Sequence, residues 1–285
     1  MSNALVTHYL EKAARGGFAI PHFNFNDCWD LQAIVAAAEE LRTPIFAATV
    51  MKVTDSLGVD LAASVCKTIA ARASVPVFLH MDHSNSVELC AKCIDAGYDS
   101  VMIDSSAKSL EENIADVRAV IALAQPRGVN VEAEIGRIRG RDDVEGSYLG
   151  NDFLVQVADA KALAEATGVD ALAIGIGTQH GFYQGKPELN FQRLSEVDQV
   201  VDTPLVLHGG TGIPVEDVRK AIKLGINKVN VGTIIRYTYL KGMHDEIERV
   251  GPAIHPGVVV APVLAEVKEV LKNAIRKCMS ENSVD

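Results

Sequence analysis

Short apolar runs alternate along the whole chain with longer stretches that have a helical apolar period. Apolar runs bounded by Gly or Pro are typical of buried strands, and apolar residues three or four positions apart are typical of amphipathic helices. The runs predict strands at 18–23, 44–50, 75–81, 98–104, 129–135 and 227–231, and two more that begin at Ala171 and Pro204. Helices are predicted at 30–41, 61–73, 86–96, 110–125, 156–167, 192–200 and 215–224, and a long charged loop at 136–153.

This alternation predicts the fold class. Eight strands, each followed by a helix, are the count of an α/β protein with a (β/α)8 TIM barrel, here a single domain over residues 1–285. A doubly wound open sheet is the alternative, but it would usually have a Gly-rich turn after its first strand, and none follows Phe23. In a barrel the active site lies at the carboxyl ends of the strands, so the polar residues there should face one another. These residues are His22, Asn24, Asp82, His83, Asp104, Glu132, Glu134, His180, His208 and Asn230.

The composition limits the classes of partner. With 48% hydrophobic and 22% charged residues, the chain is a globular protein without the polar bias of disorder. The formal net charge of −10 argues against nucleic acid and against an anionic membrane surface, although a local pocket can still bind a small anion. No apolar run reaches about 18 residues, and the first residues do not resemble a signal peptide, so we expect a cytoplasmic protein. The odd number of cysteines, 5, fits reduced thiols, and we expect Cys90 and Cys93 to be structural.

Three histidines that follow apolar runs are candidates for a metal site. His83, His180 and His208 each stand where a strand is expected to end, and His180 and His208 are followed by Gly. Three neutral imidazoles that leave one position open suit a catalytic Zn²⁺, which acts as a Lewis acid on a carbonyl or hydroxyl oxygen. Asp82 precedes His83, and neighbouring strand residues point to opposite faces unless the strand has ended. We therefore expect Asp82 to lie beside the metal as a general acid or base. The remaining histidines His8, His80, His244 and His255 are expected to be ordinary core or surface residues.

Two glycine-containing turns are candidates for phosphate binding. Gly209, Gly210 and Thr211 follow the seventh strand and offer backbone N–H groups and a hydroxyl, and a helix begins soon after. The segment 230–233 forms the second turn, after the eighth strand. In TIM barrels, the turns after these two strands commonly bind phosphate.

Taken together, these motifs resemble a known family. They are Pro21-x-Phe23-Asn24, His80-x-Asp82-His83, Val131-Glu132-Ala133-Glu134-Ile135-Gly136, Gly177-x-x-His180-Gly181, Leu207-His208-Gly209-Gly210-Thr211-Gly212-Ile213-Pro214 and Lys228-Val229-Asn230-Val231. The set is similar to that of the class II, metal-dependent ketose-phosphate aldolases, in the branch of the tagatose-bisphosphate and fructose-bisphosphate aldolases. The resemblance extends over nearly the whole chain.

The resemblance implies a role for each matching residue. His83, His180 and His208 would bind Zn²⁺, which would polarise the ketose C2 carbonyl, and Glu134 would lie near the metal or bind it in an alternative position. Asp82 would exchange the proton of the C4 hydroxyl when the C3–C4 bond is cleaved or formed. A monovalent cation, Na⁺ or K⁺, would bridge the phosphate of the dihydroxyacetone phosphate half. The residues that would bind this half are Asn24, Gly181, Gly209, Gly210, Thr211, Asn230, Val231, Gly232 and Thr233.

The chain departs from the family pattern at three places. One is Ile234, where the family commonly has an acidic residue after the Thr of the last phosphate turn. The loop after the fifth strand usually has a Glu that exchanges a proton on the dihydroxyacetone phosphate carbon, and Asp142 stands there. The bisphosphate aldolases have an Asp-Pro-Arg whose Arg reaches the distal phosphate, and the chain has His255-Pro256-Gly257 instead. His255 or Arg236 could substitute for it. We therefore expect a ketose 1-phosphate with a hydroxylated, carboxylated or sulfonated distal end, with a 1,6-bisphosphate as the alternative.

Two other functions stay open on the sequence alone. A zinc hydrolase of the barrel type would also use histidines and an Asp, but it usually has a His-x-His on its first strand, and His22 has no such pair. A non-catalytic regulatory relative would be expected to lose metal ligands, and all three are present. The partner implied is a small sugar phosphate, and the protein would be a homodimer or homotetramer.

Overall fold

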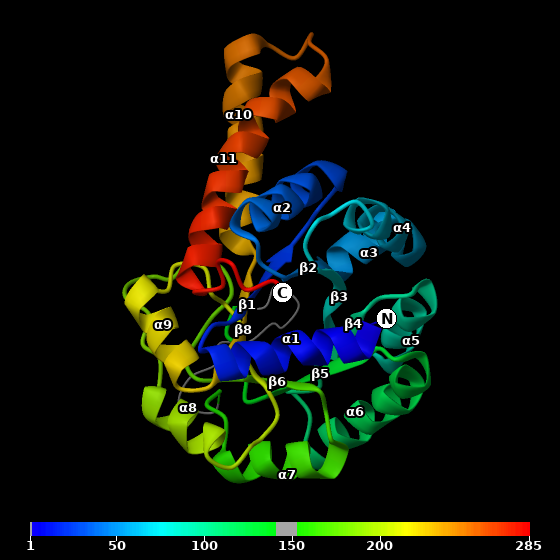
Figure 1. Cartoon of the computed structure of the whole chain (residues 1–285), viewed down its shortest axis with the longest axis vertical. Coiled ribbons are helices and arrows are strands. Elements are labelled where there is room, and N and C mark those ends of the chain that lie inside the picture. The colour runs from blue at the N-terminus through cyan, green and yellow to red at the C-terminus, as the bar shows by residue number, and fades with distance from the viewer. Residues whose placement is uncertain (1, 141–152) are drawn as a thin grey trace.

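Eight parallel strands form a closed barrel in the computed structural model, which describes residues 2–140 and 153–285. Each strand pairs with its neighbours in chain order, and β1 closes the barrel by pairing with β8. The strands are β1 (Ile20–Asn24), β2 (Ile45–Val50), β3 (Val77–Ser84), β4 (Ser100–Ile103), β5 (Asn130–Ile135), β6 (Ala171–Ile174), β7 (Leu205–Leu207) and β8 (Ile226–Val231). The predicted TIM barrel is confirmed (Figure 1).

Helices surround the barrel and follow its strands (Figure 1). The predicted ones are α2 (Cys28–Leu41), α4 (Val59–Ala70), α5 (Val87–Ala96), α6 (Leu110–Ala124), α7 (Val157–Thr167), α8 (Phe191–Asp198) and α9 (Val215–Lys223). The sequence predicted no boundaries for four further helices, namely α1 (Ser2–Gly16), α3 (Met51–Leu57), α10 (Thr233–Val250) and α11 (Pro256–Lys277). The 3-10 turn η1 (Gln125–Arg127) was not predicted.

Helix α1 closes the amino end of the barrel. Its apolar face, with Val6, Tyr9 and Leu10, is buried against side chains that point inward from the strands, among them Phe46 and Phe78. In Figure 1 this helix lies across the strands. A second and larger core fills the space between the strands and the surrounding helices. Because an apolar cluster fills the amino end, the barrel can be entered only from its carboxyl end, where TIM barrels place their active sites.

The sequence pattern ended the third strand too early. It was expected to end at Met81, but β3 continues to Ser84 and therefore includes Asp82 and His83. The pairing with β4 shifts between Met81 and Ser84, which is a β-bulge, and His83 has a φ of 53°. A positive φ is uncommon for a residue other than Gly, and such residues gather at functional sites. The bulge breaks the alternation of the strand, so Asp82 and His83 can both face the same cavity.

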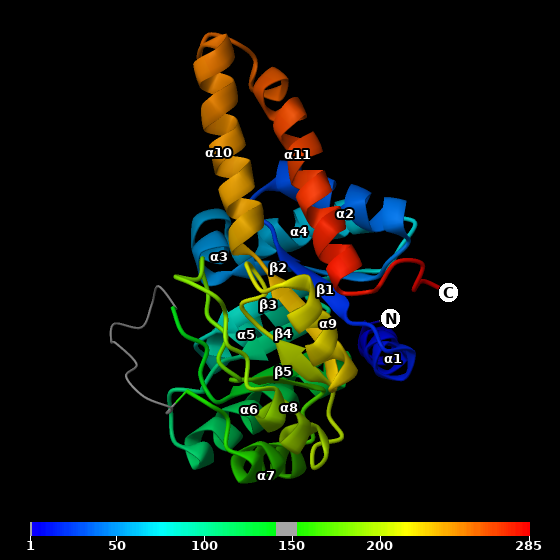
Figure 2. The ribbon, with the colours of Figure 1, turned by 90° about the vertical axis from the view of Figure 1, so that its left-hand side faces the viewer.

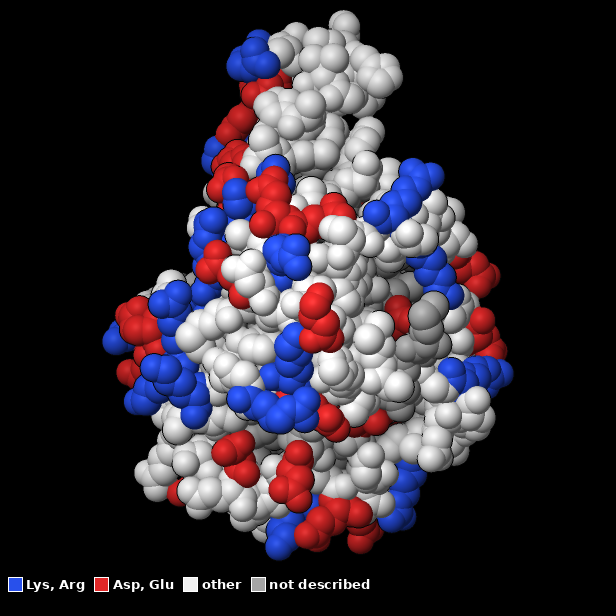
Figure 3. All heavy atoms as spheres, viewed as in Figure 1, with Lys and Arg blue, Asp and Glu red and all other residues white. Residues whose placement is uncertain are grey.

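Helices α10 and α11 form a hairpin that extends far beyond the barrel (Figure 2). They pack on each other, and α11 also packs on α2. Apolar side chains remain exposed along the hairpin, namely Tyr237, Leu240, Ile247, Ile254 and Val258. On the face seen in Figure 3, charges of both signs are mixed over the barrel, whereas much of the outer hairpin is uncharged. Among the described residues, no helix combines the length and the apolar character needed to cross a membrane.

Candidate active site

Three predicted histidines meet at the carboxyl end of the barrel. Nδ1 of His208 lies 2.8 Å from Nε2 of His83, and the His83 and His180 ring centroids are 4.9 Å apart. One ligand atom from each of the three rings lies within 4.8 Å of those of the other two. His83 comes from β3 and His208 directly follows β7. These imidazoles can therefore share one metal ion.

His180 reaches the cluster differently from the prediction. Strand β6 ends at Ile174, so His180 does not end a strand but lies in the loop that follows. This loop is joined to the loop after β5, because the backbone N–H of His180 donates to the carbonyl of Arg139 over 2.7 Å. A Cβ on Gly140 would lie 2.8 Å from the carbonyl oxygen of His180, so the two loops approach too closely for any other residue there. Contact between loops positions this histidine.

Buried carboxylates orient two of the rings. Oδ2 of Asp104 lies 2.8 Å from Nδ1 of His83, and Oε1 of Glu132 lies 2.9 Å from Nε2 of His208. An ionised carboxylate only accepts, so we assign a proton to each of these two nitrogens, and the nitrogens that face each other carry lone pairs. Burial lowers the pKa of His208 although the hydrogen bond to Glu132 opposes this, so the ring is neutral near pH 7, as a metal ligand must be. The donor set therefore fits Zn²⁺.

Glu132 also forms an ion pair inside the barrel. The Nζ of Lys228 donates to Oε2 of Glu132 over 2.7 Å, and the exposed fractions of the two side chains are 0% and 1%. Burial raises the pKa of Glu132, but the Lys228 ammonium and the hydrogen bond to His208 together hold it below its usual range. The carboxylate therefore stays ionised. Glu132 was among the strand-end residues expected at the site, but no specific role was predicted for it or for Lys228. A Lys and a Glu on apolar strands could have indicated the pair.

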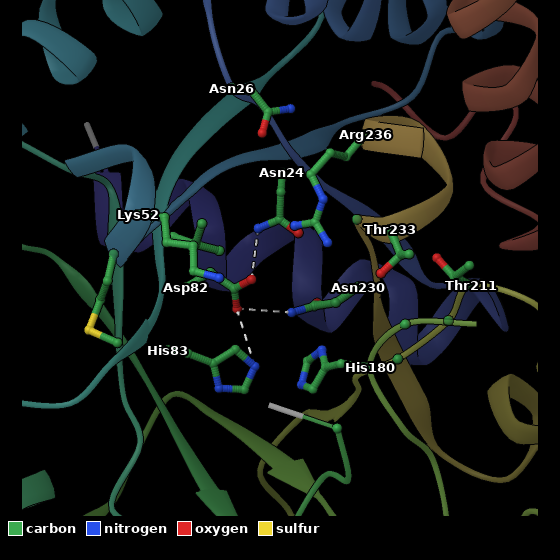
Figure 4. A pocket seen from close by; sticks show the side chains of 17 residues that line it. Asn24, Asn26, Lys52, Asp82, His83, His180, Thr211, Asn230, Thr233 and Arg236 are labelled. Carbon is green, nitrogen blue, oxygen red and sulfur yellow. Dashed lines mark hydrogen bonds and ion pairs between the residues drawn. The ribbon is translucent and has the colours of Figure 1, made fainter. Parts of the chain in front are cut away.

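Asp82 lies beside the histidine cluster and is held by amides (Figure 4). Asn24 donates to its Oδ2 over 2.8 Å, and Asn230 donates to its Oδ1 over 3.5 Å. Nε2 of His83 is 3.8 Å from Oδ1. Burial raises the pKa of Asp82, but the imidazoles of His83 and His22 beside it outweigh burial and hold this pKa well below its usual range. Asp82 is thus an oriented, ionised carboxylate next to the metal ligands, and its catalytic role stays a prediction.

His22 and His80 lie deeper, inside the barrel. Both are fully buried, and Nδ1 of His80 lies 2.8 Å from the hydroxyl of Ser100, so the expected core role of His80 fits its position. Nε2 of His22 is 3.5 Å from Oδ2 of Asp82. Burial and then the charge of Lys228 lower the pKa of His22 to about 4, so this ring is neutral. His22 therefore contacts Asp82 from the barrel interior without adding a charge.

Glu134 lies close to the metal ligands. Its Oε2 is 3.9 Å from Nδ1 of His83, and the side chain is fully buried. Burial, partly offset by His83, raises the pKa of Glu134 to about 7. This position is compatible with the expected one near the metal. Asp142 lies outside the described residues.

The two glycine-containing turns that were predicted to bind phosphate form one wall of a cavity of about 210 Å³. A Cβ on Gly209 would lie 2.3 Å from the carbonyl oxygen of Gln179, and one on Gly210 would lie 2.8 Å from that of Asn230. A Cβ on Gly232 would lie 2.4 Å from Oδ1 of Asn24. Only glycine fits at positions 209 and 210 without a shift of the backbone, and a side chain at position 232 would displace the amide of Asn24. The hydroxyl of Thr211 accepts from the N–H of Ile234 over 3.3 Å and so connects the two turns.

The cavity gathers most of the predicted substrate-binding residues. Those that line it are Asn24, Gly181, Gly209, Gly210, Thr211, Asn230, Gly232 and Thr233, with Asp82, His83 and His180. Val231 is the exception, because its side chain belongs to the apolar core. The lining also includes Asn26, Lys52 and Arg236. Of these, the sequence pattern had pointed only to Arg236, as a possible substitute for the missing arginine.

A comparison with protein families decides the assignment. Residues 4–283 match the family described as fructose-bisphosphate aldolase class-II. The chain belongs to this family. It is a class II aldolase, and thus a lyase, as the sequence motifs predicted.

Individual relatives agree with this assignment. The class II aldolase is 37% identical over 271 residues to the 6-phospho-5-dehydro-2-deoxy-D-gluconate aldolase of Bacillus licheniformis, with 94% of this chain and 92% of the relative covered. The crystal structure of the YdjI aldolase from Escherichia coli K12 matches with a TM-score of 0.86 at 29% identity, over 98% of each chain. The fructose-bisphosphate aldolase of Campylobacter jejuni shares the fold, with a TM-score of 0.83 at 22% identity over 99% of this chain and 96% of its own.

The contact between Glu132 and His208 predicts the effect of a substitution in this aldolase. Glu132→Gln keeps the shape of the side chain but places an NH₂ group against either Lys228 or His208, so the ring loses its charged acceptor. Such partners of a metal-binding histidine typically contribute about 10- to 100-fold in metal affinity. We expect a loss of this size for Zn²⁺, measured by competition with a chromogenic chelator. Glu111→Gln on the exposed side of α6 is the control, and unchanged affinity in Glu132→Gln would contradict the assignment.

Proposed function

We propose that this class II aldolase uses Zn²⁺, held by His83, His180 and His208, to cleave a ketose 1-phosphate into dihydroxyacetone phosphate and an aldehyde. The observation that carries the proposal is that the three imidazoles meet in one cluster and that two of them, His83 and His180, line one cavity with Asp82 and the two glycine turns. When bound, Zn²⁺ would supply a Lewis acid that polarises the ketose carbonyl.

The side chain of Asp82 transfers the proton of the substrate's C4 hydroxyl. During cleavage it accepts the proton of the C4 hydroxyl as the C3–C4 bond breaks, and during condensation it returns this proton. Asn24 and Asn230 hold both carboxylate oxygens, so Asp82 is oriented before the substrate arrives. Asp142 would exchange the proton at C3, and Glu134 would serve as a nearby carboxylate for the metal. The backbone N–H of Gly209 and the hydroxyls of Thr211 and Thr233 would bind the phosphate, together with Na⁺ or K⁺. The predicted N–H of Gly210 is not available, because it donates to the carbonyl of Asn230 over 2.9 Å.

The distal end of the substrate would carry a carboxylate. The Bacillus licheniformis relative is named for 6-phospho-5-dehydro-2-deoxy-D-gluconate. Numbered from its phosphate, this compound is a ketose 1-phosphate with hydroxyls on C3 and C4 and a carboxylate at C6. Cleavage between C3 and C4 gives dihydroxyacetone phosphate and 3-oxopropanoate. A substrate of this class also agrees with Gly257, because that residue offers no cation for a distal phosphate.

The alternative functions have less support. A zinc hydrolase would not account for the match to the aldolase family over residues 4–283. A non-catalytic relative would not need a preserved histidine cluster next to an oriented carboxylate. The cytoplasmic location and the absence of nucleic acid and membrane partners stay predictions from composition.

Metal removal tests the first part of the proposal. We expect chelation to abolish cleavage and Zn²⁺ to restore it, while circular dichroism shows that the barrel persists, because its core does not depend on the ion. Asp82→Asn is the matched variant: it should bind Zn²⁺ as the wild type does and lose roughly 10² to 10⁴ in kcat. Cleavage by a protein verified to be free of metal would contradict the proposal, and loss of Zn²⁺ from Asp82→Asn would make Asp82 a ligand.

Comparison of substrates tests the second part. We expect kcat/KM for 6-phospho-5-dehydro-2-deoxygluconate to exceed those for fructose and tagatose 1,6-bisphosphate by about 30-fold or more. The loss of a charged partner for the distal phosphate typically costs about 2 to 5 kcal/mol of binding free energy. This corresponds to a factor of about 30 to several thousand in kcat/KM. A coupled assay of dihydroxyacetone phosphate release measures all three. A preference for either bisphosphate would show that the distal end is not a carboxylate.

The helical hairpin would join two copies of the chain. We propose that α10 and α11 form this contact in a homodimer or homotetramer, because Tyr237 and Leu240 are 50% and 61% exposed on a projecting element. Large exposed apolar patches usually mark interfaces. Leu240→Glu should lower the mass measured by light scattering after size exclusion, whereas Leu61→Glu on α4, also an exposed leucine, should not. A wild-type chain that elutes as a monomer would refute this part.

A further inference from the structure

We propose that the two cationic side chains in the cavity lining bind opposite ends of the substrate. Lys52 binds the distal anion, and Arg236 binds the phosphate. This inference rests on the proposed function and goes beyond it by naming the residues that determine specificity. Among the described residues that line the cavity, Lys52 and Arg236 are the only Lys or Arg.

Arg236 belongs to the phosphate side of the cavity. It lies in the first turn of α10, three residues after Thr233, and residues three apart on a helix are neighbours on its surface. The same turn is tied to the other phosphate turn through the hydrogen bond between Ile234 and Thr211. In Figure 4 the Arg236 side chain extends from this helix into the cavity. A guanidinium can bind a phosphate with two parallel hydrogen bonds, which suits a dianion.

Lys52 belongs to the opposite side. It is the second residue of α3, which follows β2 directly, and Val50 at the end of β2 is paired with Asp82. The lysine therefore stands two residues beyond the partner of Asp82. In Figure 4 its side chain approaches Asp82 from the side away from Thr211 and Thr233. Asp82 thus lies between Lys52 and the phosphate turns.

The order of groups along the substrate matches this arrangement. The phosphate is on C1, the proton that Asp82 accepts is on the C4 hydroxyl, and the distal carboxylate carbon is C6. With the phosphate held by the glycine turns and C4 at Asp82, the chain of the substrate continues toward Lys52. A carboxylate there meets an ammonium, and its charge is neutralised in a cavity that already contains the charge of Asp82. The geometry points to Lys52 as the residue that replaces the arginine absent at Gly257.

The test compares two substrates that differ only at the distal end. They are 6-phospho-5-dehydro-2-deoxygluconate and the same compound with a CH₂OH group in place of the carboxylate. We expect Lys52→Met to lower kcat/KM for the carboxylate by about 30-fold or more and to change that for the alcohol by less than about threefold. Arg236→Met should lower both by the same factor. Lys92→Met, on the exposed side of α5, is the control and should change neither.

Each outcome bears on the assignment. Equal losses for both substrates in Lys52→Met, or no loss, would overturn the role of Lys52, and a loss confined to the carboxylate in Arg236→Met would reverse the two roles. Zn²⁺ content and melting temperature of each variant should equal those of the wild type. If the wild type instead prefers a 1,6-bisphosphate, the proposed substrate is wrong. The role of Lys52 is then tested by the ratio of kcat/KM for the bisphosphate to kcat/KM for the matching 1-phosphate. Lys52→Met must lower this ratio, and an unchanged ratio would refute the role of Lys52.

Discussion

A single buried ion pair constrains the centre of this barrel. Lys228 and Glu132 face each other across the interior at 2.7 Å, with no appreciable contact with solvent. Taking both charges out of water costs several kcal/mol each, and their attraction recovers this only with good geometry and further hydrogen bonds. The second oxygen of Glu132 finds such a bond at His208. Lys228, Glu132 and His208 therefore each offset the cost of burying the others. The same contacts set the orientation of His208, which is one of the three candidate metal ligands.

The remaining parts of the site are arranged around this centre by two different means. Strand residues are held by the barrel itself, including the bulge that turns His83 toward His208. Loop residues are held by close backbone contacts: the loop of His180 lies against Arg139 and Gly140, and Gly209 lies against Gln179. The cavity is therefore formed with little freedom left in its backbone. Preorganisation of this kind is what a catalytic site needs, because the groups do not have to be ordered again for each substrate.

The sequence predicted the topology and most of the site because both follow from local patterns. Alternation of apolar runs and helical periods identifies eight strands, and polar residues at strand ends identify Asp82, His83 and His208. The bulge at His83 could not be predicted, since it depends on the pairing of β3 with β4 and leaves no local composition signal. His180 was found for an incorrect reason, as an apolar run continued past the end of β6 into its loop. Lys52 had no signal, because a lysine at the start of an ordinary helix becomes notable only once β2 is seen beside Asp82.

The lack of space around the glycines of the two turns in the cavity wall has an evolutionary consequence. A Cβ on Gly209 or Gly210 would collide with a backbone carbonyl, and one on Gly232 would collide with the side chain of Asn24, so this wall can vary only if the backbone or Asn24 moves. Lys52 and Arg236, in contrast, project from the first turns of α3 and α10, where a change of side chain leaves the barrel intact. Under the proposed function, the molecule thus separates a constrained wall, which would bind the phosphate half of the substrate, from side chains that can be replaced. New specificities can arise in such a barrel through single substitutions at helix starts, with the chemistry left untouched.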